Sequence, residues 1–132
     1  MPHSVLITED DADTREALIE LARQVGLDAV GVASGVEALA VLQRGLRPCL
    51  ILLDLVMSDL DGFAFRRAQL ADPTIADIPI VVVSGGGLEV ERGARQLGLN
   101  RFLRKPLVLE ELARLFTDHC HATGAEWMRR EA

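Results

Sequence analysis

Three acidic residues stand at the ends of two apolar runs. Glu9 and Asp10 come just after the run at residues 5–7, and Asp54 ends a run that begins at Leu50. If the two runs are neighbouring strands of one sheet, the three carboxylates meet at the same edge of that sheet. Carboxylates at such short range repel each other strongly unless a cation lies among them. An all-oxygen set of ligands favours Mg²⁺ or Ca²⁺ over softer metals.

A lysine and a hydroxyl extend this pattern. Lys105 follows another strand-like stretch and precedes Pro106, and Ser84 follows the apolar run at residues 80–83. Carboxylates, a bound metal and one lysine can together bind a phosphoryl group and stabilise its transfer. The residue types therefore indicate phosphoryl chemistry at one edge of a sheet.

Composition limits the classes of protein that the chain can belong to. It has 132 residues, about one ordinary domain, and 49% of them are apolar, so it can bury a core. Its net charge of −6 argues against binding nucleic acid through phosphate neutralisation. No apolar run approaches the roughly 18 residues that a membrane helix needs. The first residues lack the basic start of a signal peptide, so we expect a cytoplasmic protein.

The cysteines and histidines give no sign of a metal or redox site. Cys49 and Cys120 are far apart in the sequence and form no CxxC pair. We expect Cys49, beside an apolar run, to be a buried reduced thiol, and the chain to contain no disulfide. The three histidines show no metal-ligand spacing and are expected at the surface.

Apolar runs alternate with helical patterns along the whole chain. The strands are expected at residues 5–8, 29–33, 49–53, 80–83 and 101–103. The helices are expected at residues 14–25, from Ser34 to Gly45, and at 63–70, 88–97 and 109 to about 120. Five such β-α units with continuously apolar strands favour a parallel sheet that is covered on both faces. Right-handed crossovers then make a three-layer α/β sandwich.

Capping residues mark several helix ends. Asp13 is the expected N-cap of the first helix, and Glu16 is placed to complete a capping box. Ser34 and Glu37 form a second capping box, and Gly26 is expected to end the first helix. The inward face of the first helix is expected to contain Ala17, Leu18, Leu21, Ala22 and Val25. That of the last helix is expected to contain Leu109, Leu112, Ala113 and Phe116.

One domain accounts for the chain. We assign residues 1–120 to it and residues 121–132 to a short C-terminal tail, with no output domain. In an open α/β sheet the ligand binds at the carboxyl ends of the strands, where the winding direction reverses. Because the acids, Ser84 and Lys105 all directly follow strands, we expect a single site there.

These features resemble the receiver domain of two-component response regulators over residues 4 to about 120. The resemblance rests on five motifs in the expected order: Glu9-Asp10, Leu53-Asp54-Leu55 leading to Asp61-Gly62, Ser84, Phe102 and Lys105-Pro106. It implies a flavodoxin-like (CheY-like) fold with strand order 2-1-3-4-5. It also implies a phosphoacceptor that catalyses only its own phosphorylation and dephosphorylation.

The resemblance assigns a metal and a nucleophile. Asp54 would receive a phosphoryl group from a histidine kinase or a phosphotransfer protein. Asp10 and Asp54 would bind Mg²⁺ directly, together with the backbone carbonyl of Val56, while Glu9 would act through water. Mg²⁺ keeps several waters, so few protein ligands are enough.

It also assigns a switch. Lys105 would stabilise the phosphoryl oxygens, and Ser84 would donate a hydrogen bond to one of them once Asp54 is modified. Phe102 would then turn inward to fill the space that Ser84 leaves. The Lys105-Pro106 peptide bond would be cis.

The chain departs from the family pattern at a few positions. Ser58 stands where proline is usual, and Gly85 stands where alanine is common. In the family, the side chains two positions after Asp54 and after Ser84 flank the path of a hydrolytic water. In this chain they are Val56 and Gly86, and neither side chain can hydrogen-bond a water. The resemblance therefore predicts slow self-dephosphorylation.

The output is expected to be a protein contact through the fourth helix, fifth strand and fifth helix. This face includes Arg92, Arg95, Arg101 and Arg104, so it fits an acidic partner or a second copy of the chain. No nucleic acid or membrane contact is expected.

Alternatives stay open at this point. The chain could be a receiver taken from a hybrid kinase or a larger regulator, or a scaffold that is never phosphorylated. A phosphatase with an aspartyl nucleophile would need a second acid where Val56 stands. A flavin-binding module would need hydroxyls, not acids, after the first strand.

Overall fold

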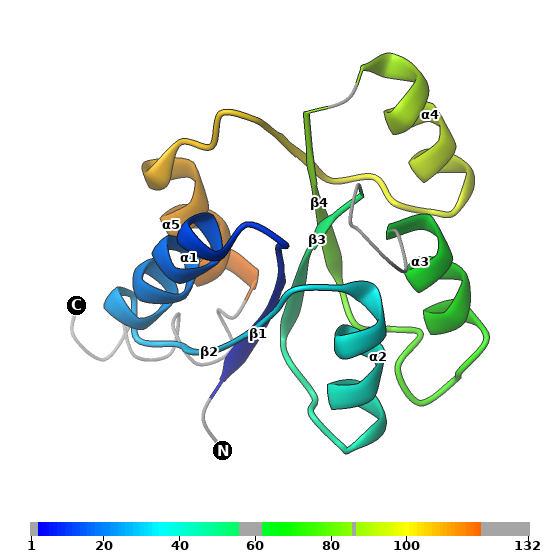
Figure 1. Ribbon diagram of the computed structural model, residues 1–132, viewed down its shortest axis with the longest axis horizontal. Coiled ribbons are helices and arrows are strands. Elements are labelled where there is room, and N and C mark those ends of the chain that lie inside the picture. Colours follow the sequence, from blue (N-terminus) through cyan, green and yellow to red (C-terminus); the bar gives the residue numbers. More distant parts are fainter. Residues whose placement is uncertain (1–2, 56–61, 86, 120–132) are drawn as a thin grey trace.

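The computed structural model of the chain describes residues 3–55, 62–85 and 87–119. Five parallel strands form one sheet in the order β2-β1-β3-β4-β5 (Figure 1). The strands are β1 (Ser4–Thr8), β2 (Asp28–Val32), β3 (Leu50–Asp54), β4 (Ile80–Ser84) and β5 (Phe102–Arg104). This order confirms the flavodoxin-like topology that the resemblance implied, and it places the winding reversal between β1 and β3.

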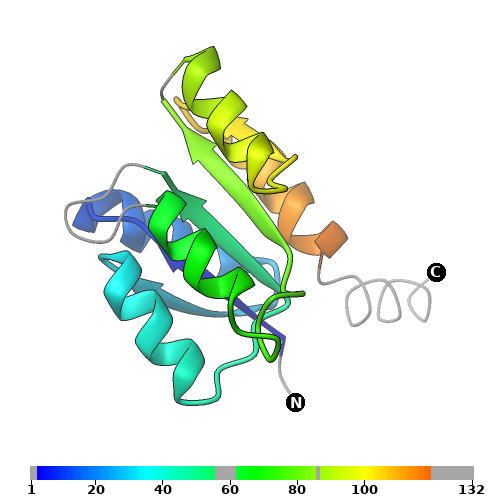
Figure 2. The ribbon, with the colours of Figure 1, turned by 90° about the vertical axis from the view of Figure 1, so that its right-hand side faces the viewer.

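Helices cover both faces of the sheet. They are α1 (Ala12–Gln24), α2 (Gly35–Gln43), α3 (Gly62–Leu70), α4 (Leu88–Gln96) and α5 (Leu109–His119). Helices α1 and α5 lie on one face, and α2, α3 and α4 lie on the other (Figure 1, Figure 2). The predicted three-layer sandwich is confirmed. Within the described ranges, no helix is both long and apolar enough to cross a bilayer.

The core consists of two apolar layers, one on each side of the sheet. On β1, Leu6 packs into the layer beneath α2, α3 and α4, whereas Val5 and Ile7 pack into the layer beneath α1 and α5. All three side chains are fully buried. Strands covered on both faces need apolar residues at every position, so these runs show no polar alternation.

The N-terminus of α1 differs from the prediction. Asp11, not Asp13, is the N-cap: its carboxylate accepts hydrogen bonds from the Thr14 backbone N–H at 2.9 Å and the Thr14 hydroxyl at 2.6 Å. These hydrogen bonds lower the pKa of Asp11. The helix therefore begins two residues earlier than predicted. Asp13 lies in its first turn, where a negative charge interacts favourably with the helix dipole.

The other two capping predictions are confirmed. The Ser34 hydroxyl accepts a hydrogen bond from the Glu37 backbone N–H at 3.1 Å, and the Glu37 carboxylate accepts one from the N–H of Ala33 at 2.9 Å. Gly26 follows α1 with a φ of 89°, a conformation that glycine adopts without strain.

The inward faces of two helices need correction. On α1, Ile19 is buried and Ala17 is exposed, so the buried face is centred closer to Ile19 than the spacing predicted. On α5, Leu112 and Phe116 are fully buried as expected, but Leu109 is 60% exposed. Leu109 is the first residue of α5.

The cysteine prediction was wrong. Cys49 is half-buried and disulfide-bonded, and its Sγ lies 3.2 Å from the carbonyl oxygen of Ser4. The other cysteine of the sequence, Cys120, lies outside the described residues. The distance between two cysteines along the sequence is not evidence against a disulfide, because crossover helices bring residues that are far apart in sequence close together in space.

Candidate functional site

Three carboxylates meet at the carboxyl edge of the sheet. Strands β1 and β3 pair with Thr8 opposite Leu53, so Glu9 and Asp54 follow directly at neighbouring positions. One carboxylate oxygen from each of Glu9, Asp10 and Asp54 lies within 4.8 Å of the other two. Glu9 is 3% exposed and Asp54 is 5% exposed, whereas Asp10 faces solvent. The structure thus brings together the three acids that the sequence predicted to meet.

Burial and repulsion act on Glu9. Desolvation raises the pKa of Glu9, and the charges of Asp54 and Asp10 raise it further. A hydrogen bond from the Asp11 backbone N–H, 3.1 Å from Glu9 Oε2, and the charge of Lys105 partly oppose this rise in the pKa. The ionised cluster is therefore unfavourable on its own, and a bound cation would relieve it.

Lys105 joins the site from the segment after β5. Its Nζ lies 3.2 Å from Asp54 Oδ2 and forms an ion pair with it. Desolvation alone would lower the pKa of Lys105, but the hydrogen bond and charge of Asp54, with the charges of Glu9 and Asp10, raise it. The ammonium is held in its charged form beside the predicted nucleophile. The Lys105–Pro106 peptide bond is cis.

Ser84 ends β4 next to this group. Its backbone carbonyl accepts a hydrogen bond from the Lys105 N–H at 3.0 Å, and its side chain is buried. Asp54 pairs with Val83 in the sheet, so the hydroxyl comes one residue after the position opposite the nucleophile. This location suits the contact with a phosphoryl oxygen that the resemblance implies.

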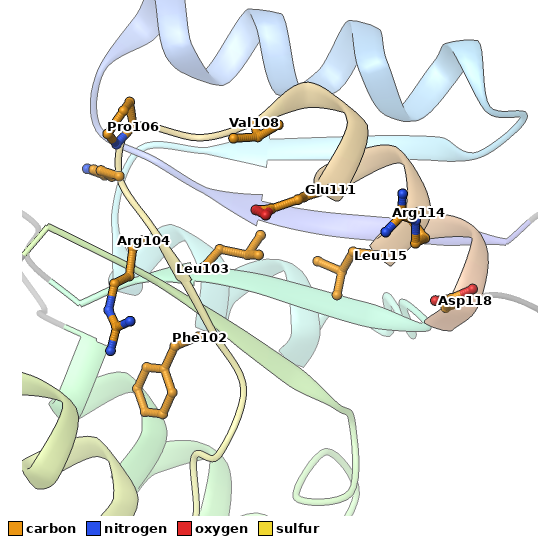
Figure 3. A pocket seen from close by; sticks show the side chains of 10 residues that line it. Phe102, Leu103, Arg104, Pro106, Val108, Glu111, Arg114, Leu115 and Asp118 are labelled. Carbon is orange, nitrogen blue, oxygen red and sulfur yellow. The ribbon is translucent and has the colours of Figure 1, made fainter.

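Phe102 lies on the opposite side of β5 from α5. Its half-buried ring packs against the core layer beneath α2, α3 and α4, and Figure 3 shows it pointing away from α5. The Arg95 guanidinium carbon lies 4.9 Å from the ring centroid, a distance at which a cation attracts the face of an aromatic ring. Inward rotation of Phe102 stays a prediction.

The donor set fits a hard divalent cation. Three carboxylates form the cluster. A hollow of about 350 Å³, lined by Glu9, Asp10 and Lys105 among others, opens beside it. Mg²⁺ prefers oxygen ligands and keeps several waters, so an open hollow next to a few acids is suitable for it. Val56, whose carbonyl is the remaining predicted ligand, lies outside the described residues, as does Gly86.

Two supporting residues were not singled out from the sequence. Arg15 of α1 donates a hydrogen bond from Nη1 to the carbonyl oxygen of Glu9 at 2.9 Å. The hydroxyl of Thr8 contacts the backbone of β3 on both sides of Leu53. A hydroxyl among apolar strand residues, directly before Glu9, was the available signal for Thr8. Nothing in the spacing of Arg15 revealed its contact.

A second, larger hollow lies between β5 and α5 and has a volume of about 590 Å³. Leu103 and Leu115 point toward each other across it, and Glu111 and Arg114 add charges from α5 (Figure 3). The acidic cluster contributes none of its lining residues. The candidate site is therefore the acidic cluster beside the smaller hollow.

Helix α4 is joined to β5 by an ion pair. The guanidinium of Arg104 donates two hydrogen bonds to the carboxylate of Glu91, at 2.9 and 2.8 Å. The Glu91 side chain is 6% exposed, whereas that of Arg104 is 70% exposed. Arg92 and Arg95 are exposed on the same helix.

Comparison with known proteins agrees with these observations. The family model of the response regulator receiver domain matches residues 5–117. An uncharacterized 14.6 kDa protein of Leptolyngbya boryana is 31% identical over 119 residues, covering 89% of this chain and 90% of that protein. The DNA-binding response regulator MtrA of Mycobacterium tuberculosis is 33% identical over 121 residues. That match covers 87% of this chain but 51% of MtrA, so the chain spans about half of that relative.

Solved structures of similar proteins share the fold. A response regulator receiver protein from Pseudomonas putida is 34% identical, with a TM-score of 0.82 over 89% of this chain and 98% of that one. The receiver domain of the sensor histidine kinase PA1611 from Pseudomonas aeruginosa PAO1 has a magnesium ion coordinated in its active site cleft. It is 27% identical, with a TM-score of 0.79 over 89% of this chain and 97% of that one. The chain therefore belongs to the family of response regulator receiver domains.

Proposed function

We propose that Asp54 accepts a phosphoryl group from a phosphohistidine of a histidine kinase or a phosphotransfer protein. The observation that supports this most directly is that the Asp54 carboxylate has both acidic residues and a lysine as neighbours. Asp54 lies within a cluster of three acids spanning 4.8 Å, and Lys105 Nζ lies 3.2 Å from its Oδ2. A nucleophile between a cation site and a lysine suits transfer of a group that carries negative charge.

The reaction balances without a further reactant. A carboxylate oxygen of Asp54 attacks the phosphorus in line with the bond to the histidine nitrogen. The new O–P bond forms while the N–P bond breaks, and the electron pair of the N–P bond stays on the imidazole. The product is an acyl phosphate on Asp54, and Lys105 stabilises the phosphoryl oxygens while their charge redistributes.

Mg²⁺ is the cofactor in this proposal. Asp10 and Asp54 would bind it directly, with the Val56 carbonyl as a third protein ligand and Glu9 acting through a water. When bound, the ion neutralises charge on the transferring group and offsets the repulsion among the acids. The magnesium ion reported for the PA1611 receiver domain supports this assignment by likeness alone.

Phosphorylation would switch a protein contact. Ser84 would donate a hydrogen bond to a phosphoryl oxygen, and Phe102 would move into the space that Ser84 leaves. The face made by α4, β5 and α5 would change as a result, because Phe102 lies between α4 and α5. The exposed arginines of this face, Arg92 and Arg95, favour an acidic protein partner or a second copy of the chain.

This proposal includes no enzymatic activity beyond the chain's own phosphorylation and dephosphorylation, and it places the protein in the cytoplasm with its phosphodonor. The chain covers 90% of the Leptolyngbya boryana protein and 51% of MtrA, and these matches do not favour the alternative of a receiver within a larger regulator.

Incubation with Mg²⁺ and phosphoramidate, followed by intact mass spectrometry, tests the proposal. We expect the wild type to gain one phosphoryl group, while Asp54→Asn gains none. Asp72→Asn is a matched control, because Asp72 lies in the turn after α3, away from the cluster. Gain of a phosphoryl group by Asp54→Asn, or none by the wild type, would contradict the proposal. Size-exclusion chromatography of both forms then tests dimerisation.

A further inference from the structure

Thr8 is a buried polar residue that the proposed reaction does not use. It is the last residue of β1, directly before Glu9, and only 2% of it is exposed. Its hydroxyl donates a hydrogen bond to the carbonyl oxygen of Leu52 at 3.1 Å and accepts one from the Asp54 backbone N–H at 3.2 Å. One side chain therefore links the end of β1, which directly precedes Glu9 and Asp10, to the backbone of Asp54.

We propose that Thr8 is a positioning residue for phosphoryl transfer, and this inference rests on the proposed function of Asp54. Its hydroxyl would set the separation between the β1 acids and the Asp54 carboxylate. Thr8 itself would touch neither the metal nor the phosphoryl group. It would act through the backbone of Asp54 and through Glu9, its direct neighbour in the chain.

The location of the hydroxyl supports this role. Thr8 pairs with Leu53 in the parallel register, and the two backbone groups that its hydroxyl contacts belong to the residues on either side of Leu53. The contact therefore lies at the last paired position of β1 and β3. Beyond this position, the distance from Glu9 and Asp10 to Asp54 depends on the conformation of the segment that follows β1.

Repulsion among the acids acts against the contact that the Thr8 hydroxyl makes. Three carboxylates at short range repel each other, which pushes the ends of β1 and β3 apart when no cation is bound. Mg²⁺ requires near-ideal octahedral geometry with short bonds to oxygen, so a small displacement of one ligand weakens binding. The rate of phosphoryl transfer also depends on the position of the attacking carboxylate, so its displacement slows the reaction. Loss of the Thr8 bridge should therefore affect both Mg²⁺ affinity and the transfer rate.

Three variants separate the hydroxyl of Thr8 from the rest of its side chain, and a fourth variant is the control. Thr8→Val replaces the hydroxyl with a methyl group of similar size, and Thr8→Ser keeps the hydroxyl but loses the methyl group. Thr8→Ala loses both, so the Ser and Ala variants differ only in the hydroxyl. Thr117→Val is the matched control. The Thr117 hydroxyl also bonds to backbone carbonyls, those of Ala113 and Arg114 within α5.

Mg²⁺ affinity is measured by isothermal titration calorimetry, and the rate of phosphorylation by intact mass with phosphoramidate. For Thr8→Val we expect both to fall roughly three- to ten-fold, the effect of losing one hydrogen bond of ordinary strength. Thr8→Ser and Thr117→Val should stay close to the wild type. Urea unfolding should show that Thr8→Val is folded under the conditions of both assays.

Two results would overturn the inference: Thr8→Val equal to the wild type in both measurements, or Thr8→Ser impaired as much as Thr8→Val. If Thr8→Val does not fold, the Ser and Ala variants decide, because Ala should be weaker than Ser by the same factor. Failure of the wild type to gain a phosphoryl group would refute the proposed function. The calorimetric comparison would still test Thr8, so the two failures are distinguishable.

Discussion

Lys105 and Asp54 are 51 residues apart in the chain, yet the Lys105 ammonium lies 3.2 Å from the Asp54 carboxylate. The pair joins the end of β3 to the segment after β5, across the intervening strand β4. A positive charge thus occupies one side of the predicted nucleophile, while Glu9 and Asp10 occupy another. Lys105 would stabilise the phosphoryl group, whereas the acids would bind the metal, so mutations can separate the two contributions.

Replacing Lys105 should have opposite effects on binding and on transfer. In Lys105→Met the Mg²⁺ site loses a neighbouring cation, so we expect Mg²⁺ to bind roughly three- to ten-fold more tightly. Phosphorylation by phosphoramidate should slow by about ten- to a hundred-fold, because a charged donor to the phosphoryl oxygens is lost. Calorimetry and intact mass measure the two effects. Weaker Mg²⁺ binding together with slower transfer would point to general disruption of the site and count against this account.

Replacing Glu9 should stabilise the metal-free protein. Desolvation raises the pKa of Glu9 above its ordinary value of 4.5, so its contribution to stability is fully present below pH 4.5 and is lost as the pH rises through the raised pKa. Glutamine does not ionise, so Glu9→Gln does not lose this stability as the pH rises. In EDTA at pH 7 we expect the free energy of unfolding to rise by at most about 1 kcal/mol.

Urea unfolding at pH 4 and pH 7 checks this prediction, with Glu20→Gln, an exposed residue of α1, as the control. The gain should be present at pH 7 and nearly absent at pH 4. With saturating Mg²⁺ the order should reverse, because the wild type binds the ion more tightly and gains more stability from it. A variant less stable than the wild type in EDTA at pH 7 would show that Glu9 is not held in an unfavourable charged state.

Gly31 makes room for the helix that supports the acidic segment. A Cβ at Gly31 would lie 2.6 Å from Ile19 Cδ1 and 3.0 Å from Arg15 Cγ. We therefore expect Gly31→Ala to destabilise the fold by about 1–3 kcal/mol. Ile19→Val should recover part of that loss in a double-mutant cycle. Gly87→Ala is the control, since nothing lies within 4 Å of its Cβ position. Equal effects of the two alanine variants on urea unfolding would refute this reading.

The Glu91–Arg104 pair should be visible in a carboxyl titration. Hydrogen bonds from Arg104 lower the pKa of Glu91, so stability from the pair is present above the ordinary glutamate pKa and is lost as the pH falls through the lowered value. In Arg104→Met the buried carboxyl keeps its desolvation but loses its donors, and its pKa should rise.

Carbon-detected NMR of the Glu91 carboxyl measures this change directly. Arg92→Met, which removes an exposed arginine next to Glu91 in sequence, should shift the titration much less. If both variants shift it equally, general charge and not the paired hydrogen bonds determines the pKa of Glu91.

The phosphorylated state should be long-lived. Val56 and Gly86 carry no side-chain group that could orient an attacking water, although both lie outside the described residues. We expect a half-life of minutes or longer after the phosphodonor is removed, followed by the decay of the phosphorylated mass. Val56→Asn should speed that decay, because an amide can hydrogen-bond the water. Decay of the wild type within seconds in Mg²⁺ buffer would contradict the prediction.

Much of the fold could be predicted because the strands are covered on both faces. Continuous apolar runs located all five strands within one or two residues, and the alternation with helices gave the three layers. The ends were harder. Asp11 and Asp13 are both good N-caps, and only the contact with Thr14 decides between them. The buried face of α1 includes Ile19, whose Cδ1 lies 2.6 Å from the position that a Cβ at Gly31 would take.

The site was predictable where its residues end a strand or come just after one. Glu9, Asp10, Asp54, Ser84 and Lys105 needed only the assumption of a parallel sheet to be placed at one edge. Thr8 and Arg15 act through backbone groups, so their own types reveal little about their partners. The disulfide at Cys49 was missed because the spacing of two cysteines along a chain does not determine their distance in the fold.

The central claim is that Asp54, and no other residue, becomes an acyl phosphate when Mg²⁺ is present. Borohydride reduction after incubation with Mg²⁺ and phosphoramidate converts such a group to the alcohol, and peptide mass spectrometry then locates it. The account predicts homoserine at position 54 in Mg²⁺ and unmodified Asp54 in EDTA. Modification at any other residue, or equal modification of Asp54 with and without Mg²⁺, would contradict it.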